Sequence, residues 1–283
     1  MIVIARLTVR ELVRRRIVLL LAVLTIVSVA LVAFGVERLV TLAREEGLPE
    51  LEIRIGVSQI MILIAFMFSF VLAMTAAFLG APAIGGDIES GVALALLAHP
   101  LSRMDLLVGR WLGLALVVVG CTVASGALAI GVVAGISGFG PPHPVLALAF
   151  LSAQAVVLMT LTLALGTVMP AIGAGAVAVV AFGVGWMAGV LASVAAALGL
   201  ESLAGAAEAS RWLFPSDGLW RGVVYGLEPP AAAMIANGAS PRGMEANPFF
   251  ALAPPPVVFD IWAIAWVVIV LGLAGWRLSR RDL

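Results

Sequence analysis

The sequence predicts an all-α, polytopic membrane protein with six transmembrane helices, an amphipathic helix before the first, and a short helix between the second and third. Its 283 residues are 63% apolar and only 11% charged, whereas soluble domains carry about 25% charged residues. The charges also cluster, and none occurs between Pro144 and Leu200. Because a charge at the bilayer centre costs about 2.5 to 3.5 kcal/mol, long uncharged runs indicate spanning helices.

An amphipathic pattern precedes the first apolar run. On a helix, one face of about 100° is apolar and a separate stripe is basic. The apolar face consists of Ile2, Ala5, Val9, Leu12 and Val13, and the basic stripe of Arg6, Arg10 and Arg14. We expect such a helix to lie in the headgroup plane, where its arginines reach anionic membrane lipids. The alternative is an ordinary basic segment that flanks a span.

Six segments have the length of about 20 apolar residues that a spanning helix needs. They are residues 17–36, 59–84, 108–136, 145–168, 172–198 and 257–276. We therefore interpret residues 1–283 as a single transmembrane domain. Met169-Pro170, followed by Gly173 and Gly175, supplies a tight turn between the fourth and fifth spans.

Two connections on the side away from the termini carry patterns of their own. The segment Glu37–Ser58 is acidic and is expected to form a short surface helix. The longer connection, residues 199–256, contains aromatic side chains suited to the headgroup level. Ser216 is expected to be the N-cap of a short helix that ends near Tyr225. These features predict a small outer cap or a re-entrant element rather than a soluble domain.

The distribution of charge predicts the orientation. With six spans, both termini lie on one side, and that side has 10 Arg and 5 acidic residues. The other side has 6 Arg and 11 acidic residues. The positive-inside rule therefore places both termini in the cytoplasm. The formal net charge of the whole chain is zero, which argues against a nucleic-acid partner.

The loop between the second and third spans, residues 85–107, carries the most specific pattern. We expect the chain to leave the second span at Gly85-Gly86 and to meet an acidic cluster at Glu89. A short apolar helix over 92–98 is then ended by His99-Pro100. Such a helix is too short to cross a membrane, so it is suited to lie on the surface or to dock into a partner's groove.

The next helix has a start signal of its own. Ser102, with Asp105 three residues later, resembles a capping box. Arg103 and Arg110 follow, at the cytoplasmic mouth of the third span. The loop therefore ends in a helix whose first turns are charged.

This loop resembles the corresponding loop in permease subunits of ABC transporters of the type-2 exporter class. Those permeases typically have an acidic cluster with Glu, then Gly, an apolar run, Pro-x-x-Arg and Leu-Leu-x-Gly-Lys. The matching residues here are Asp87, Glu89, Gly91, 94–97, Pro100, Arg103, Leu106, Leu107 and Gly109. Arg110 stands where Lys is common, and Val92 where Thr is common after the Gly. The six spans and the long last outer loop agree with the same family.

A second local match concerns the outer connection. Pro215-Ser216-Asp217, with Arg221, is similar to a Pro-Thr-Asp element in one subgroup of these permeases. That subgroup includes the permease of nitrous-oxide-reductase maturation.

The family resemblance implies partners and residue roles. Such permeases pair with a second permease copy, here expected as a homodimer, and with two ATPase subunits in the cytoplasm. The resemblance also implies that the chain lies in the cell membrane of a prokaryote. Their loop between spans two and three is a coupling helix that sits in an ATPase groove. Glu89, Gly91, Pro100 and Arg103 would be the ATPase-coupling residues, with Arg103 pairing across the interface or with lipid phosphate. The alternative is a simple turn with a solvated charge cluster.

The sequence excludes one ATP site within the chain. All 16 basic residues are Arg, whereas the phosphate-binding G-x-x-x-x-G-K-[ST] loop requires a Lys. We therefore expect no cofactor in this chain, with ATP and Mg bound by the partner ATPase.

No catalytic or metal-binding residues are predicted. The two histidines, His99 and His143, flank spans on opposite sides, and Asp260 stands alone near the outer start of the sixth span. The single Cys121 lies inside a span. Because the spans offer almost no ionisable residues for proton coupling, a proton-driven transporter is disfavoured.

Small-residue spacings predict close helix packing. The pairs Gly109 and Gly113, and Gly185 and Gly189, would let two backbones approach, either within the chain or at a homodimer seam. Few polar residues occur in the spans, so a pathway between them would be mostly apolar. This favours a hydrophobic or amphipathic substrate.

Three functions therefore remain. The first is a permease of an ATP-driven exporter that works by alternating access. The second is a maturation permease that moves a sulfur or copper species for a periplasmic metalloenzyme. The third is a membrane scaffold without transport. In each case, an accessory periplasmic subunit is a further candidate partner.

Overall fold

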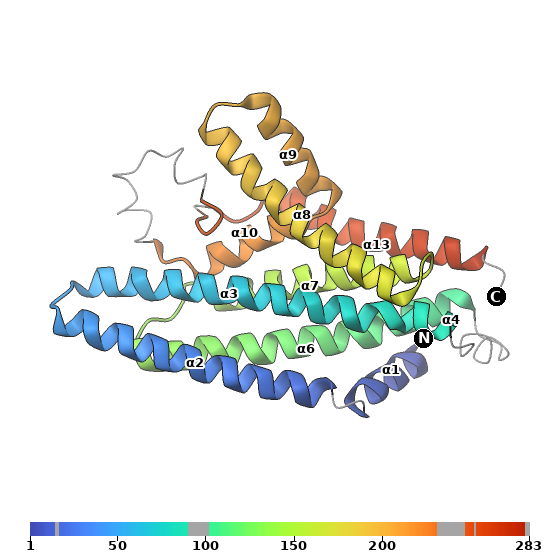
Figure 1. Cartoon of the computed structure of the whole chain (residues 1–283), viewed down its shortest axis with the longest axis horizontal. Coiled ribbons are helices and arrows are strands. Elements are labelled where there is room, and N and C mark those ends of the chain that lie inside the picture. Colours follow the sequence, from blue (N-terminus) through green and yellow to red (C-terminus); the bar gives the residue numbers. More distant parts are fainter. Residues whose placement is uncertain (15–16, 90–101, 231–246, 252, 281–283) are drawn as a thin grey trace.

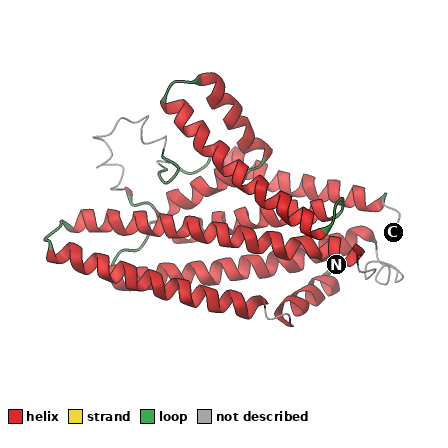
Figure 2. Cartoon of the chain, viewed as in Figure 1, coloured by secondary structure: helices red, strands yellow, loops and turns green. Residues whose placement is uncertain are grey.

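A computed structural model describes residues 1–14, 17–89, 102–230, 247–251 and 253–280 of the chain. The described residues form helices and connecting turns, without a strand (Figure 2). The elements are α1 (Ile2–Arg14), α2 (Ile17–Glu45), α3 (Glu50–Ala81), the π-helical turn η1 (Pro82–Gly86), α4 (Asp87–Glu89), α6 (Arg103–Ser137), α7 (Pro144–Gly166), α8 (Ala171–Ala197), α9 (Glu201–Leu213), α10 (Ser216–Leu227) and α13 (Val257–Ser279).

Six of the described helices are long and apolar enough to cross a membrane, namely α2, α3, α6, α7, α8 and α13. The predicted all-α class with six transmembrane helices is thereby confirmed. The helices α2, α3, α6, α7 and α13 run along the long axis of the molecule, while α8 crosses them obliquely and α9 folds back on it (Figure 1). We call the end that holds α1, α4 and the last turn of α13 the basic end, and the other the far end.

The predicted surface helix over 37–58 is wrong, because α2 and α3 both continue through this segment. No helix breaker occurs after the apolar run until Gly47 and Pro49. Gly47 has a φ of 71°, and the N–H groups of Gly47 and Leu48 donate to the carbonyls of Arg44 and Ala43. This Schellman-type ending suits glycine, which adopts positive φ without steric cost. The two extensions form a hairpin whose facing side chains, Val36, Val40, Ile53 and Val57, are buried.

The second candidate span ends at Gly86, in agreement with the predicted exit at Gly85-Gly86, and the helical path continues through η1 into α4. Both glycines lie within η1, and Gly85 lies against the turn between α7 and α8. A Cβ on Gly85 would lie 3.3 Å from the Cα of Ala171, and one on Gly166 would lie 3.3 Å from the carbonyl oxygen of Ala81. Glycine therefore serves close packing here, which brings α4 next to the start of α8.

The connection after α8 returns toward the interior of the bundle. The side-chain amide of Gln154 donates to the carbonyl oxygen of Ser216 at 3.1 Å, and the N–H of His143 donates to the carbonyl oxygen of Gly226 at 3.1 Å. Gln154 lies ten residues after the start of α7, which corresponds to a depth of about 15 Å at 1.5 Å per residue. The helix α10 therefore runs beside the first half of α7, from about the middle of α7 to the far end.

Ser216 has a different role from the one predicted. The N-cap of α10 is Pro215, and no side chain caps the helix. Ser216 is the first helical residue, and both its carbonyl and its hydroxyl oxygen lie within reach of the Gln154 amide. The serine thus ties α10 to α7, because a buried amide in an apolar bundle needs a hydrogen-bond partner.

Glycine at position 226 allows the backbone of α10 to approach the backbone of α7 closely. A Cβ there would lie 2.8 Å from the backbone nitrogen of Ala147 and 2.9 Å from its Cβ. We expect Gly226→Ala to destabilise the fold by about 1 to 3 kcal/mol, because backbone atoms cannot move aside as a flexible side chain can. The measurement is thermal unfolding of the detergent-solubilised chain. Gly131→Ala is the matched control, since a Cβ there meets no atom within 4 Å; equal losses in both variants would contradict the packing argument.

Candidate functional site

Charged side chains from three helices meet around Arg110 at the basic end. One terminal nitrogen of the guanidinium donates to Glu11 Oε2 at 2.8 Å, and the other donates to Asp87 Oδ2 at 2.7 Å. Arg110 itself is only 9% exposed. An arginine with five fixed donors can serve two carboxylates at once. The cluster therefore joins α1, α4 and α6.

The glycine pair at 109 and 113 positions α1 against this cluster. A Cβ on Gly109 would lie 2.7 Å from the Cβ of Ile4, and one on Gly113 would lie 2.7 Å from the carbonyl oxygen of Ala5. The spacing predicted from the sequence thus serves packing within the chain, with α1 as the helix that fits onto it. This contact brings Glu11, one turn further along α1, to the guanidinium of Arg110.

The buried side of α1 differs from the predicted apolar face. The residues buried on α1 are Ile4, Thr8 and Leu12, whereas Ile2 and Val13 are exposed. The predicted face was chosen by hydrophobicity, but the helix buries the row that matches the groove at Gly109 and Gly113. Thr8 fits this row because its hydroxyl donates to the carbonyl oxygen of Ile4 within the same helix.

Glu89 contacts the start of α8. Its Oε1 accepts a hydrogen bond of 2.9 Å from the N–H of Ala171, the first residue of that helix. The first N–H groups of a helix have no partner within it, and the helix dipole favours a negative charge there. The acidic residue that the sequence singled out is thus bound to a span of its own chain.

Arg103 contacts the end of α13. One of its terminal nitrogens donates to the carbonyl oxygens of Leu278 at 2.7 Å and Ser279 at 3.3 Å. These are carbonyls of a helix C-terminus, where cations are favoured. The predicted cap just before it is confirmed, because the side chain of Ser102 accepts from the N–H of Asp105 at 2.9 Å.

The two described ends of the loop are therefore each tied to a different membrane helix. Glu89 is hydrogen-bonded to the first residue of α8, and Arg103 is hydrogen-bonded to the last turn of α13. Arg110 connects α4 and α6 to α1. Gly91, Pro100 and the predicted short helix over 92–98 lie outside the described residues. The sequence argument did not identify Arg110 and its partners Glu11 and Asp87 as a unit. The available signal was a charged residue inside the third span's helix, which requires a counter-charge when it is buried.

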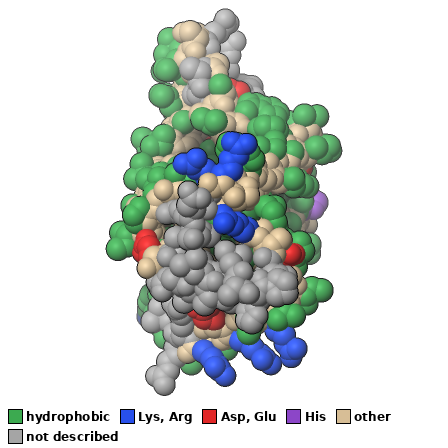
Figure 3. Space-filling view, turned by 90° about the vertical axis from the view of Figure 1, so that its right-hand side faces the viewer, with side chains coloured by type: hydrophobic (Ala, Val, Ile, Leu, Met, Phe, Trp, Pro, Cys, Tyr) green, Lys and Arg blue, Asp and Glu red, His purple; other side chains and the backbone are tan. Residues whose placement is uncertain are grey.

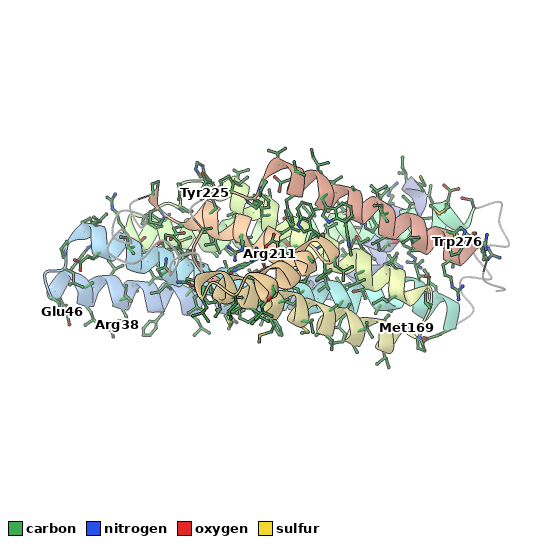
Figure 4. All side chains as sticks on the ribbon, turned by 90° about the horizontal axis from the view of Figure 1, so that it is seen from above. Arg38, Glu46, Met169, Arg211, Tyr225 and Trp276 are labelled. Atoms are coloured by element: carbon green, nitrogen blue, oxygen red, sulfur yellow. The ribbon has the colours of Figure 1, made fainter. Side chains whose placement is uncertain are left out.

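A second charge cluster lies between α8, α9 and α10. Nε of Arg211 donates to Asp217 Oδ2 at 2.7 Å, and Nε of Arg221 lies 3.8 Å from the same oxygen. The side chain of Asp217 is 3% exposed. Along the long axis, Arg211 lies between Tyr225 and Met169 (Figure 4). The sequence predicts almost no ionisable groups within the spans, but the connection after α8 places Arg211, Asp217 and Arg221 against the span α8.

The glycine pair at 185 and 189 faces this second cluster. A Cβ on Gly189 would lie 2.0 Å from Asp217 Cγ, and one on Gly185 would lie 3.0 Å from the ring of Phe214. Both glycines are thus occupied within the chain, by the segment that leads into α10. A homodimer seam through these two positions does not fit this arrangement.

An apolar cavity of about 370 Å³ lies between α2, α3 and α6. Leu24, Met67, Phe68 and Val117 are among its lining residues, and the only polar groups in the lining are hydroxyls and the thiol of Cys121. Within the described residues, no group of three or more His, Cys, Asp and Glu side chains is placed to hold a metal ion.

Comparison with known proteins identifies one family. The family model described as ABC-2 family transporter protein matches residues 2–283, which is nearly the whole chain. Among curated proteins there is no match.

Removal of Arg110 tests the first cluster. We expect Arg110→Met to destabilise the protein by about 3 kcal/mol, because Asp87 and Glu11 would lose their counter-charge in a largely buried site. Unfolding by heat in detergent measures the loss. Arg54→Met is the control, since its pair with Glu50 is exposed on both sides and spans 3.5 Å, which limits its contribution to about 0 to 1 kcal/mol. A loss for Arg110→Met no larger than for the control would disprove the structural role.

Proposed function

The chain belongs to the ABC-2 family of transporter proteins, and on this premise we propose that it is the permease subunit of an ATP-driven exporter. The match over residues 2–283 and the six apolar helices support a membrane transport component. The observation that carries the coupling role is the pair of contacts from Glu89 to α8 and from Arg103 to α13. Energy would enter through separate ATPase subunits that dock at residues 85–107.

The basic end would face the cytoplasm. Basic side chains gather along the lower edge of this end, at the level of α1, and again above its centre (Figure 3). Arg6, Arg10 and Arg14 on α1 are exposed, and an excess of arginine marks the cytoplasmic side. The exposed apolar residues Ile2 and Val3 on the same helix suit a position in the headgroup plane.

The contacts at the basic end offer a route for mechanical coupling. A displacement of the loop by an ATPase would pull on the first turn of α8 through Glu89 and on the last turn of α13 through Arg103. The ion pair of Arg110 with Glu11 would carry the same displacement to α1. Because packed helices move as rigid bodies, small shifts at one end reorient whole spans. Alternating access would follow from this reorientation.

The apolar cavity between α2, α3 and α6 supports a hydrophobic or amphipathic cargo. Its lining consists of aliphatic and aromatic side chains with a few hydroxyls, which matches an acyl chain or another apolar body rather than an ion. The small number of polar groups in the lining also agrees with a pathway that excludes charged solutes.

A second copy of the chain completes the proposed exporter. Since Gly185 and Gly189 are covered by the segment leading into α10, a seam on α8 would use the exposed face of that helix. Val180, Val184 and Met187 lie on this face. The maturation alternative, with a sulfur or copper cargo, rests on the Pro215–Asp217 element and gains no specific support from the geometry of Asp217.

Substitution of Glu89 tests the coupling route. In a complex reconstituted with its ATPase, we expect Glu89→Ala to lower substrate-stimulated ATP hydrolysis at least about threefold, because α8 loses a charge-assisted hydrogen bond. Glu89→Gln keeps an acceptor oxygen and should stay closer to wild type. The control readout is co-purification of the ATPase. If Glu89→Ala abolishes co-purification, then Glu89 contacts the ATPase directly; if hydrolysis is unchanged, the coupling role is wrong.

Association with an ATPase subunit separates the permease from the scaffold. The purified chain alone should hydrolyse no ATP, because it has no Lys for a phosphate-binding loop. The chain isolated from its native membrane under mild conditions should carry an ATPase subunit. Hydrolysis by the isolated chain would refute the proposal, and a complex with no ATPase would favour the scaffold.

A further inference from the structure

A second cavity lies at the far end and differs in chemistry from the apolar one. Its volume is about 210 Å³, and its lining includes His143 at the start of α7, Tyr225 and Glu228 at the end of α10, and Phe250 of the segment before α13. It therefore combines aromatic rings with one carboxyl group. The export proposal assigns no role to any of these residues.

Glu228 is a buried carboxyl group with one satisfied and one unsatisfied oxygen. The residue is 7% exposed, and its Oε2 accepts a hydrogen bond of 2.9 Å from the N–H of Ala251. Its Oε1 is buried, and no hydrogen-bond donor among the described residues reaches it. An ionised carboxylate accepts hydrogen bonds on both oxygens, and a buried polar atom without a partner is unfavourable. Among the residues that the structure describes, the site thus lacks one donor.

The surroundings make the charged form of Glu228 unfavourable. Burial raises the pKa of Glu228 to about 7, although the hydrogen bond from Ala251 acts in the opposite direction. No ion pair joins Glu228 to any residue in the part of the chain that the structure describes. A cation placed beside the carboxylate would supply both the missing donor and the missing counter-charge.

The walls of the cavity are held in place and contain aromatic rings. The rings of His143 and Tyr225 stack with centroids 5.6 Å apart and an interplanar angle of 16°. The indole N–H of Trp220 donates to the carbonyl oxygen of Pro248 at 2.9 Å, which together with Ala251 fixes the segment that carries Phe250. Aromatic faces attract cations, so they favour the same type of ligand as the carboxylate.

We propose that this cavity binds a small organic cation with N–H donors, such as a protonated amine or an amidinium, with its donor directed at Glu228. A quaternary ammonium group fits less well, because it has no hydrogen to donate to Oε1. The volume lies below the range of about 300 to 1,000 Å³ of drug-sized sites, so the ligand is compact. The inference depends on the far end alone and does not require ATP coupling.

The test uses benzamidine as the cationic probe and benzamide as its neutral counterpart of the same shape. The full chain in detergent, at about pH 8, should bind benzamidine, and titration calorimetry or saturation-transfer NMR would measure the affinity. We expect Glu228→Gln to weaken benzamidine at least about tenfold, because a charge-assisted hydrogen bond is lost. This variant keeps an acceptor for the Ala251 N–H. Tyr225→Leu should weaken the probe less, through the lost aromatic face.

Lowering the pH gives an independent readout. Affinity for benzamidine should fall as the pH drops through about 7, because Glu228 then becomes protonated and neutral. His143 and Tyr225 are the other titratable residues that line the cavity. The variant His143→Gln therefore repeats the measurement without the imidazole, and a pH dependence that persists in it reports Glu228.

Glu52→Gln is the control, since it makes the same change on an exposed residue of α3. Its affinity for benzamidine should equal that of the wild type. The proposal is overturned if millimolar benzamidine does not bind, if benzamide binds equally well, or if Glu228→Gln leaves the affinity unchanged. The proposal is also overturned if Glu52→Gln lowers the affinity for benzamidine as much as Glu228→Gln does, because the effect would then be one of overall charge.

Discussion

The cost of placing a charge in an apolar bundle governs this structure. Where Arg110 and Asp217 enter the bundle, the chain supplies the counter-charge from another helix. Arg110 is paired with Glu11 and Asp87, and Asp217 is paired with Arg211. These pairs cross between helices, so they hold the elements together as well as neutralising the charge. Glu228 and Asp260 differ, since each has one buried oxygen that no donor among the described residues reaches.

The same constraint concentrates connections at the basic end. Glu89 holds the first turn of α8, Arg103 holds the last turn of α13, and Arg110 holds α1. These helices belong to different parts of the chain, yet all of them meet next to the loop for which we propose the coupling role. A permease driven by a separate ATPase, as proposed, would need such a junction, because a force on one loop would have to reach several spans.

The helices were predictable because each is dictated by a local pattern. Long uncharged runs identified all six spans, and Ser102 with Asp105 identified the start of α6. The errors arose where packing decides. Residues 37–58 continue α2 and α3 because Val36, Val40, Ile53 and Val57 bury against the fold. Ser216 holds Gln154 instead of capping its helix. Sequence spacing does not reveal these contacts, because the residues that meet are far apart along the chain.

The sequence by itself determined the class of protein, the number of spans, the absence of a Lys-dependent ATP site and the loop that resembles a coupling element. These follow from composition and from motifs of neighbouring residues. Only the tertiary structure decided that Gly109 and Gly113 receive α1, that Gly189 receives Asp217, and that α10 returns beside α7. The physical reason is that a glycine spacing predicts close contact with some helix, and a single buried charge requires some counter-charge. Which segment supplies the contacting helix or the counter-charge depends on how the helices pack.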